Sequence, residues 1–138
     1  MVYVSSCEVY LVIIPSIFLR RLYVKKSLKN TEEGFELMLR NVLADAVLIK
    51  PLEIHVDSKP IPIGSIKLIT ESGSVLNKDV SESNPVNFSL NTAVTIRVEG
   101  IKLEPGEHEI VFVATTKDYG SIKFNVRDSI GFATVLVC

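Results

Sequence analysis

Three segments in the second half of the chain, residues 93–99, 109–116 and 121–127, carry apolar side chains at every second position. Because successive side chains of a β-strand point to opposite faces, this alternation indicates strands with a buried face. Pro105, in the turn between the first two segments, has a φ that suits the second position of a turn, and Gly106 accepts the positive φ required next. The three segments therefore predict a meander of adjacent strands, covered by a sheet that the rest of the chain supplies.

Residues 109–116 differ from the two flanking segments because they are apolar on both faces. Ile110 and Phe112 would point one way, whereas Val111 and Val113 would point the other. A strand that is apolar on both faces is typical of the middle of a sheet that is covered on both sides. We therefore expect this segment to be the central strand, lying between two layers.

The remaining segments with a strand pattern are short and are separated by turns rich in Gly, Pro, Asn and Ser. They comprise residues 18–28, 34–41, 46–57 with an interruption at Pro51, 65–70, 86–90 and 130–138. In the first of them, Leu22 and Leu28 would be buried and Tyr23 would face outward. About eight to ten short, mainly antiparallel strands at this spacing are typical of two packed sheets. The sequence therefore predicts an all-β, single-domain β-sandwich of immunoglobulin or fibronectin type.

Length and composition are those of one globular domain. The 138 residues are 47% hydrophobic and 22% charged, which indicates a folded chain with a single core. The formal net charge of -1 offers no overall field that would attract nucleic acid. Cys7 and Cys138 are too far apart in the sequence to form a metal-binding or redox motif, which favours a reduced, cytoplasmic protein. Frequent Ile, Val, Lys and Glu residues give the composition a thermophile-like character.

The N-terminal stretch is apolar apart from Glu8 and several serines. It lacks the basic start and the cleavage site of a secretory signal, and Pro15 interrupts it short of the roughly 20 residues that cross a membrane. We expect residues 1–17 to form an apolar extension or an extra strand, ahead of a β-sandwich domain at residues 18–138. Two alternatives are a membrane-proximal anchor, flanked by the basic residues that follow, and a disordered or artefactual extension upstream of the true start.

Glu53, His55 and Asp57 are the candidate metal ligands. At the spacing of a strand, all three would project from one face, while the apolar residues between them project from the other. Two carboxylates and an imidazole are suitable ligands for Zn, Mn or Fe. The same residues would also form an ordinary solvated strand face. The sequence favours this second interpretation, and we expect no bound cofactor.

His108 follows the Pro-Gly turn and shares a strand face with Ile110 and Phe112. We therefore expect a histidine at the rim of the core with a backbone hydrogen-bond partner, rather than a catalytic base. Glu107 and Glu109 share the opposite face. A pair of carboxylates can divide the roles of acid and base, but a solvated strand edge explains these two more simply.

A short basic stretch contains an aromatic residue, an arrangement that can follow a phosphate backbone. Its members are Arg20, Arg21, Lys25, Lys26 and Lys29, with Tyr23 among them. Glu32 and Glu33 follow, and lysines on an edge strand also protect against aggregation, so we expect no nucleic-acid binding. The sequence contains no G-x-S-x-G, no phosphate-binding glycine-rich motif and no H-E-x-x-H, so an active site of its own would depend on His55 or His108.

Three stretches carry a resemblance to a known family. They are Gly-Phe-Glu-Leu-Met-Leu-Arg-Asn at 34–41, Leu-Glu-Ile-His-Val-Asp-Ser-Lys-Pro-Ile-Pro at 52–62 and Leu-Glu-Pro-Gly-Glu-His-Glu-Ile-Val-Phe-Val at 103–113. Together they resemble the small β subunit of bacterial C-glycoside deglycosidases and its uncharacterised relatives, over about residues 29–126. The resemblance implies a β-sandwich that partners a larger, metal-dependent barrel subunit.

Three hypotheses for the function follow. The first is a non-catalytic assembly or interaction module, either a homo-oligomer or the companion of a larger subunit, with contacts through apolar termini and edge strands. The second, which the resemblance implies, is the accessory subunit of a carbohydrate-active enzyme. The third is a small metal-dependent enzyme that uses Glu53, His55 and Asp57. We favour the first, and we expect neither catalysis by the chain alone nor insertion into a membrane.

Overall fold

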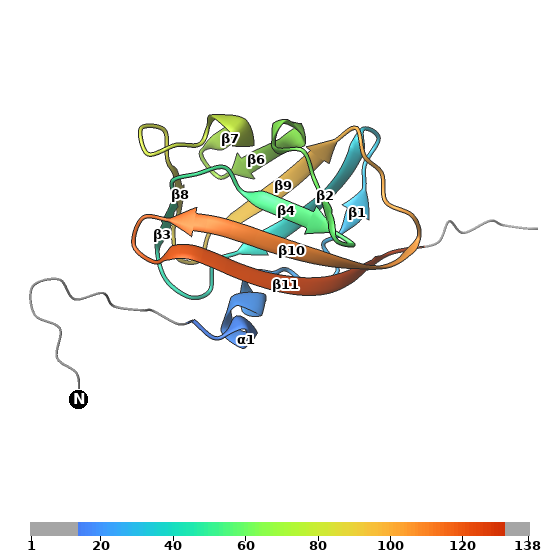
Figure 1. Cartoon of the computed structure of the whole chain (residues 1–138), viewed down its shortest axis with the longest axis horizontal. Coiled ribbons are helices and arrows are strands. Elements are labelled where there is room, and N and C mark those ends of the chain that lie inside the picture. Colours follow the sequence, from blue (N-terminus) through green and yellow to red (C-terminus); the bar gives the residue numbers. More distant parts are fainter. Residues whose placement is uncertain (1–13, 132–138) are drawn as a thin grey trace, which may run out of the picture.

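Two antiparallel β-sheets pack face to face in the computed structural model, which describes residues 14–131 (Figure 1). One sheet has the strand order β1-β2-β9-β6-β7, and the other has the order β5-β4-β10-β3-β8, with β11 also paired to β10. This arrangement confirms the predicted all-β sandwich. The strands are β1 (Lys29–Asn30), β2 (Gly34–Arg40), β3 (Ala46–Leu48), β4 (Glu53–Val56), β5 (Lys59–Pro60), β6 (Ile66–Thr70), β7 (Gly73–Leu76), β8 (Val86–Phe88), β9 (Ala93–Glu99), β10 (Gly106–Thr116) and β11 (Gly120–Ile130).

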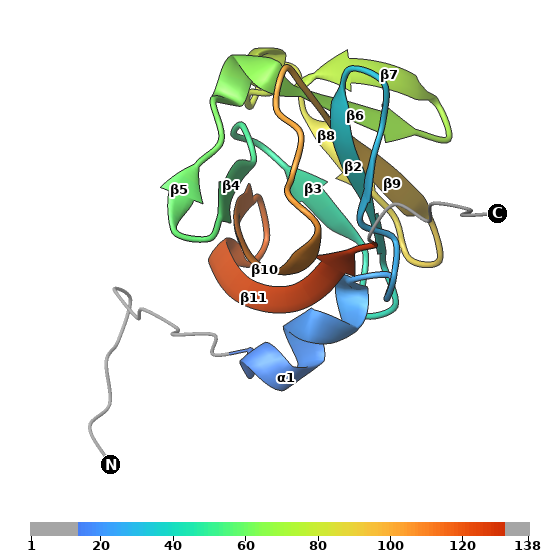
Figure 2. The ribbon, with the colours of Figure 1, turned by 90° about the vertical axis from the view of Figure 1, so that its right-hand side faces the viewer.

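Helical structure in the described residues is confined to four short segments. These are α1 (Ser16–Leu19) and the 3₁₀ turns η1 (Arg20–Leu22), η2 (Ile63–Ser65) and η3 (Asn77–Asp79). None of the helices between residues 14 and 131 is long and apolar enough to cross a membrane. α1 lies beneath β11 in both views of the ribbon (Figure 1, Figure 2). In η1, the Arg20 Nε donates a hydrogen bond of 3.1 Å to the Asn125 carbonyl of that strand.

The strand predicted at residues 18–28 is wrong, because this segment begins as a helical turn. Leu19 and Leu22, three residues apart, share a helical face and are both buried. Tyr23, which we expected to face outward, is 7% exposed and forms an isolated bridge with Leu39. A short apolar run is compatible with either period, so alternation alone could not separate the two structures.

The predicted meander is wrong at its first turn, because β9 and β10 lie in different sheets. β9 pairs with β2 and β6, whereas β10 pairs with β11 over its whole length. The connection at residues 100–105 crosses between the sheets, with Ile101 and Leu103 packed against the core. Gly106 has the predicted positive φ, at 114°. A period of two identifies a strand, but it does not identify the strand beside it.

β10 is the central strand of its sheet, as predicted. β11 pairs along one edge, while β4 and β3 follow one another along the other edge, on either side of the interruption at Pro51. Ile110 and Phe112 are fully buried between the sheets, whereas Val111 and Val113 on the outer face are half-buried. The described residues therefore bury the inner face of this strand except at Ala114, and they cover the outer face only in part, rather than both faces as predicted.

β2 supplies the core of the other sheet, and its burial follows the predicted pattern. Phe35, Leu37 and Leu39 are all buried. Gly34, at the start of the strand, is required by close backbone approach, because a Cβ atom there would lie 1.9 Å from the Val98 carbonyl oxygen. The predicted N-terminal extension (residues 1–17) and C-terminal strand (residues 130–138) fall mostly outside the described residues.

Candidate functional site

His108 lies at the end of the sandwich where β10 begins, and hydrogen bonds hold both sides of its ring. Nδ1 is 2.6 Å from Oδ2 of Asp57, in the turn after β4, and Nε2 is 2.6 Å from the carbonyl oxygen of Glu104. The other oxygen of Asp57 accepts a hydrogen bond of 3.0 Å from the amide of Glu109. His108, Asp57 and Glu104 are termed the His108 clamp below. The ring is 8% exposed and has a backbone partner, which confirms the predicted rim position.

Both partners of the ring are hydrogen-bond acceptors, so the clamp is satisfied only when both ring nitrogens carry a proton. Burial opposes this charge, but the carbonyl of Glu104 and the carboxylate of Asp57 outweigh it and raise the pKa of His108. The hydrogen bonds from His108 and from the Glu109 amide lower the pKa of Asp57. With both nitrogens engaged, the imidazolium has no lone pair for a proton or a metal, so its role here is structural.

The three candidate metal ligands do not converge. Glu53 and His55 lie on β4, where Glu53 is exposed and His55 is half-buried, whereas Asp57 lies beyond the strand with a φ of 50° and bonds to His108. Within residues 14–131, no group of three His, Cys, Asp or Glu side chains is placed to share a metal ion. The geometry offers no support for a common site, and the metal-dependent enzyme stays a prediction.

Glu107 and Glu109 lie on the outer face of β10, beside Arg127 of β11. One guanidinium nitrogen of Arg127 pairs with Glu107, and the other lies 3.9 Å from Oε2 of Glu109. The two carboxylates thus share one cation on an accessible surface, where such ion pairs contribute little to stability. The two carboxylates lie on the solvated outer face of a central strand rather than on the strand edge that we expected, and the arrangement does not separate an acid from a base.

The basic stretch does not present its aromatic ring to a ligand. Tyr23 is buried, and its hydroxyl donates a hydrogen bond of 2.5 Å to Asp128 of β11. Burial and this hydrogen bond raise the pKa of Tyr23. Base stacking requires an accessible ring face, and Tyr23 is only 7% exposed. The absence of nucleic-acid binding stays a prediction.

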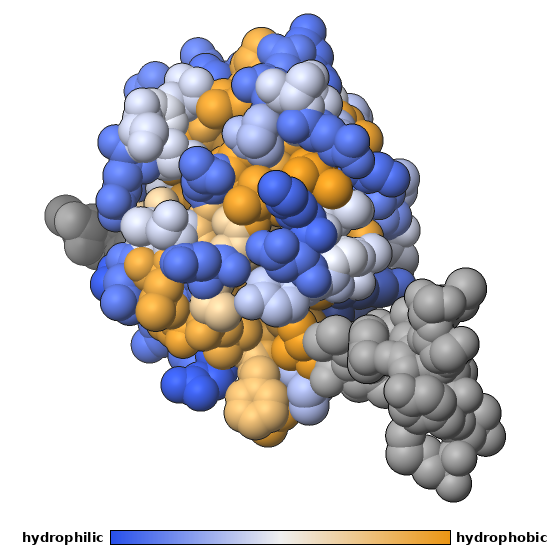
Figure 3. Space-filling view, turned by 90° about the vertical axis from the view of Figure 1, so that its left-hand side faces the viewer, coloured by the Kyte–Doolittle hydropathy of each residue, from blue (hydrophilic) through white to orange (hydrophobic). Residues whose placement is uncertain are grey.

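An apolar cleft of about 500 Å³ opens between the sheets at the opposite end of the sandwich, where β10 finishes. Side chains from α1, from η1 and from strands of both sheets form its walls, and they include Leu22, Leu39, Leu48, Val94, Phe112 and Ile122. Figure 3 views this end of the molecule and shows apolar surface at the centre and along the lower margin, between polar side chains. This feature is termed the open cleft below.

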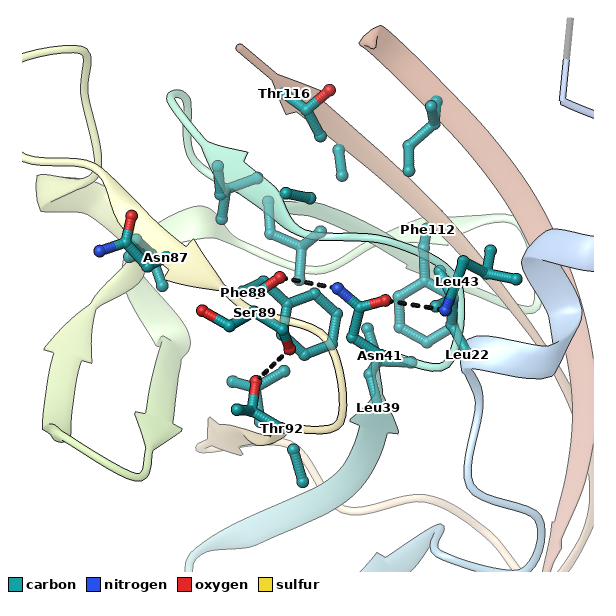
Figure 4. A pocket seen from close by; sticks show the side chains of 18 of the residues that line it. Leu22, Leu39, Asn41, Leu43, Asn87, Phe88, Ser89, Thr92, Phe112 and Thr116 are labelled. Carbon is teal, nitrogen blue, oxygen red and sulfur yellow. Dashed lines mark hydrogen bonds between the residues drawn. The ribbon is translucent and has the colours of Figure 1, made fainter. Parts of the chain in front are cut away.

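The buried polar groups in the wall of the open cleft are satisfied by the protein itself. The Asn41 amide nitrogen donates to the carbonyls of Ala44 and Phe88, at 2.6 and 2.7 Å, and its oxygen accepts from the amides of Leu43 and Ala44. Figure 4 shows Asn41 between Phe88 and Leu43. The Thr116 hydroxyl is bonded within the turn between β10 and β11. These groups stabilise the wall and need no ligand to complete their hydrogen bonds.

Sequence reasoning missed the open cleft, although one signal for it was present. Ala46 and Ala114 line the cleft from β3 and β10. Small residues at inward positions of two strands leave space that larger residues would fill. Period-two alternation treats alanine and leucine alike, so it indicates which face is inward but not how well that face is filled.

The described lining of the open cleft is mostly apolar and contains few titratable groups. Glu71 is the one charged residue among its described lining side chains, and they include no histidine or cysteine. Acid–base or nucleophilic catalysis would require a titratable group placed against a reacting atom. The chemistry-bearing groups that the sequence singled out lie elsewhere, in the His108 clamp and on the outer face of the sheet that contains β10.

A family model described as hydroxymethylglutaryl-CoA reductase, N-terminal domain, matches residues 18–131. A search among curated proteins found no match. The family match overturns the resemblance to the deglycosidase β subunit, since it covers all three stretches on which that resemblance rested. Those stretches meet demands of the fold: Gly34 avoids the Val98 carbonyl, and Leu103 to His108 form the connection and the clamp. The chain belongs to the family of hydroxymethylglutaryl-CoA reductase N-terminal domains.

Proposed function

We propose that the chain is a non-catalytic β-sandwich module that acts by assembly, with a second copy or with a larger subunit. The observation that carries this proposal is the exposure of large apolar side chains around α1. Ile17 is 67% exposed, Phe18 is 47% exposed, and Val42 is 37% exposed and lines the same shallow depression as Ile17. Neighbouring apolar side chains in water are typical of a surface that a partner covers.

The surroundings of these side chains indicate the chemistry of the partner surface. Arg20, Arg21 and Lys25 line the depression together with Ile17 and Val42. A complementary surface would have an apolar centre and acidic groups at its margin, because charge complementarity guides association and specificity. The basic stretch thus has a role in this proposal that does not involve nucleic acid.

Family membership supports one identity for the larger subunit. We infer that it is the catalytic part of a hydroxymethylglutaryl-CoA reductase, on the same chain or on another, because the family is described as the N-terminal domain of that enzyme. A reduced, cytoplasmic setting is part of the same proposal, since Cys7 and Cys138 form no disulfide-type pattern in the sequence.

Light scattering on the full chain tests the proposal, alone and mixed with a reductase catalytic domain. We expect either a mass of at least twice 15.3 kDa for the chain alone or joint elution with the catalytic domain. The double variant Ile17→Ser/Phe18→Ser should abolish the association. Leu76→Ser is the matched control, because Leu76 is 43% exposed on β7, away from α1. A monomer that elutes apart from the catalytic domain, or association that survives the double variant, would contradict the proposal.

A further inference from the structure

The open cleft is too large to be a packing defect. Protein interiors are packed as densely as organic crystals, and their voids rarely exceed the size of a water molecule. The cleft measures about 500 Å³, within the range of about 300 to 1,000 Å³ that is typical of small-molecule sites. Among the described residues, a cleft of this size between two sheets is large enough to hold a small molecule.

The walls of the cleft specify the part of the molecule that enters it. Aliphatic and aromatic side chains form most of the lining, and the buried amide of Asn41 and the hydroxyl of Thr116 already have partners within the protein. A buried polar part of a ligand would lose its hydrogen bonds to water without gaining others. Water itself is disfavoured in an apolar cavity for the same reason. The geometry therefore favours a hydrocarbon chain.

The mouth of the cleft specifies the other part of the molecule. Its exposed polar lining residues are Glu71, Ser72, Asn87, Ser89 and Tyr119, of which only Glu71 is charged. Hydroxyl and amide groups can bond to an alcohol, whereas the carboxylate of Glu71 would repel an anionic head. An uncharged polar head fits this rim better than the carboxylate of a fatty acid does.

We propose that the open cleft binds the hydrocarbon chain of a single-chain amphiphile whose head is uncharged and carries a hydroxyl group. The hydrocarbon tail of the ligand lies against Leu39, Val94 and Phe112 between the sheets, and its head lies among the polar groups at the mouth of the cleft. The proposal does not rest on the proposed assembly, because ligand binding is measured by titration and not by the oligomeric state, although Phe18 both lines the cleft and is exposed at α1.

A single tryptophan provides the reporter, because the chain contains none. Phe88 lines the cleft and is half-buried, so Phe88→Trp places an indole against the expected ligand. Titration with straight-chain alcohols from hexanol to decanol should give saturable binding with one site. The affinity should rise about four-fold with each added methylene until the cleft is filled. The absence of saturable binding, as expected if a protein segment fills the cleft instead, would overturn the proposal.

Matched substitutions on one strand locate the binding. In the Phe88→Trp background, Ala114→Phe places a ring in the cleft and should weaken decanol binding at least about ten-fold. Val113→Phe adds a ring on the outer face of the same strand and should leave the affinity unchanged. Ala46→Phe and Val47→Phe repeat this comparison on β3, in case the first pair fails to fold. Equal affinities in folded variants of either pair would place the binding elsewhere and overturn the proposal.

The head group is tested with decanoate, which has a charged head and an alkyl tail like that of decanol. Decanoate should bind about five-fold more weakly than decanol at neutral pH, because of repulsion by the carboxylate of Glu71 at the mouth. Glu71→Gln should remove most of this difference without changing the affinity for decanol. Tighter binding of decanoate than of decanol would contradict the proposed head group.

Discussion

The two ends of the sandwich differ: polar contacts close one end, and an apolar cleft opens at the other. Where β10 begins, polar side chains span the gaps between elements: His108 reaches Asp57 and Glu104, and Tyr23 reaches Asp128. Where β10 finishes, the sheets diverge around the apolar open cleft. The first end is termed the clamped end and the second the open end. The clamped end is therefore held by polar contacts within the chain, whereas the described residues leave the open end unfilled.

The comparison also separates stability from binding within one small domain. Buried polar networks are stabilising only when all their members are satisfied, and the clamp meets this condition through contacts within the chain. Exposed and cleft-lining apolar groups gain more when another molecule covers them. The residues that maintain the fold and the residues that bind are therefore expected to respond differently to substitution.

The largest expected difference comes from truncating one buried side chain at each end. Ile110 is fully buried beside His108, so Ile110→Ala should lower the free energy of unfolding by about 3 to 4 kcal/mol. Leu48 is half-buried in the wall of the open cleft, so Leu48→Ala should cost only about 1 kcal/mol. Urea unfolding measures both losses. Equal losses would mean that the open end is as tightly packed as the clamped end.

Removing the ring of the clamp is the next largest effect. His108→Ala leaves the carbonyl of Glu104 and the carboxylate of Asp57 without their ring partner, so we expect a loss of about 2 kcal/mol in urea unfolding near pH 6. His55→Ala removes the other histidine from a half-buried position on the outer face of β4, and should change stability by less than about 0.5 kcal/mol. A similar loss of stability in both variants would mean that the His108 clamp contributes no more than the half-buried His55 does.

The pH dependence of stability sharpens this test. The folded-state pKa of His108 is raised. Its contribution to the free energy of unfolding is therefore complete below its unfolded-state pKa of about 6.5, and it is lost as the pH rises through the folded-state pKa. The folded-state pKa of Asp57 is lowered, so its contribution is present above about 3.9 and is lost on acidification below that value. Between about pH 5 and about pH 8, the free energy of unfolding of the native protein should decline, and His108→Gln should remove this decline. Parallel profiles for the two proteins would contradict the ionised clamp.

A smaller effect is expected from the second contact at the clamped end. Tyr23→Phe removes the hydroxyl that donates to Asp128, whose carboxylate keeps the amides of Leu28 and Ser129 as donors. We expect a loss of about 1 kcal/mol in thermal or urea unfolding. Tyr119→Phe, at the rim of the open end, makes the same chemical change at a residue that is 36% exposed, and should be close to neutral.

The sequence predicted the strands better than their partners. Alternation in β2, β9 and β11 placed Phe35, Ile96 and Phe124 inward, and all three are buried. Alternation could not predict that β9 and β10 join different sheets, because pairing depends on contacts between segments that are distant in the chain. It also misassigned residues 18–28, where the buried positions Leu19 and Leu22 have helical spacing.

The candidate site was less accessible to prediction than the fold. The rim position of His108 followed from its strand face, but its partner Asp57 was assigned to a metal set because strand spacing was extended past the end of β4. Asp57 and the adjacent Ser58 both have positive φ, at 50° and 69°, and this turn directs the carboxylate toward His108. The open cleft depends on the volume left between two sheets, and the alternation of apolar and polar residues carries no information on that volume.

The smallest expected effect tests whether the open cleft is real space in solution. Adding carbon atoms to a well-packed core typically costs about 1 to 3 kcal/mol, and we expect a cost of at least about 1 kcal/mol for Val98→Leu, at a fully buried position opposite Phe35. Ala114→Leu adds three carbons toward the cleft, so it should cost nothing and can raise the free energy of unfolding by up to about 1 kcal/mol. If Ala114→Leu destabilises the protein as much as Val98→Leu does, the open end is already filled. In that case the two ends differ in polarity but not in packing.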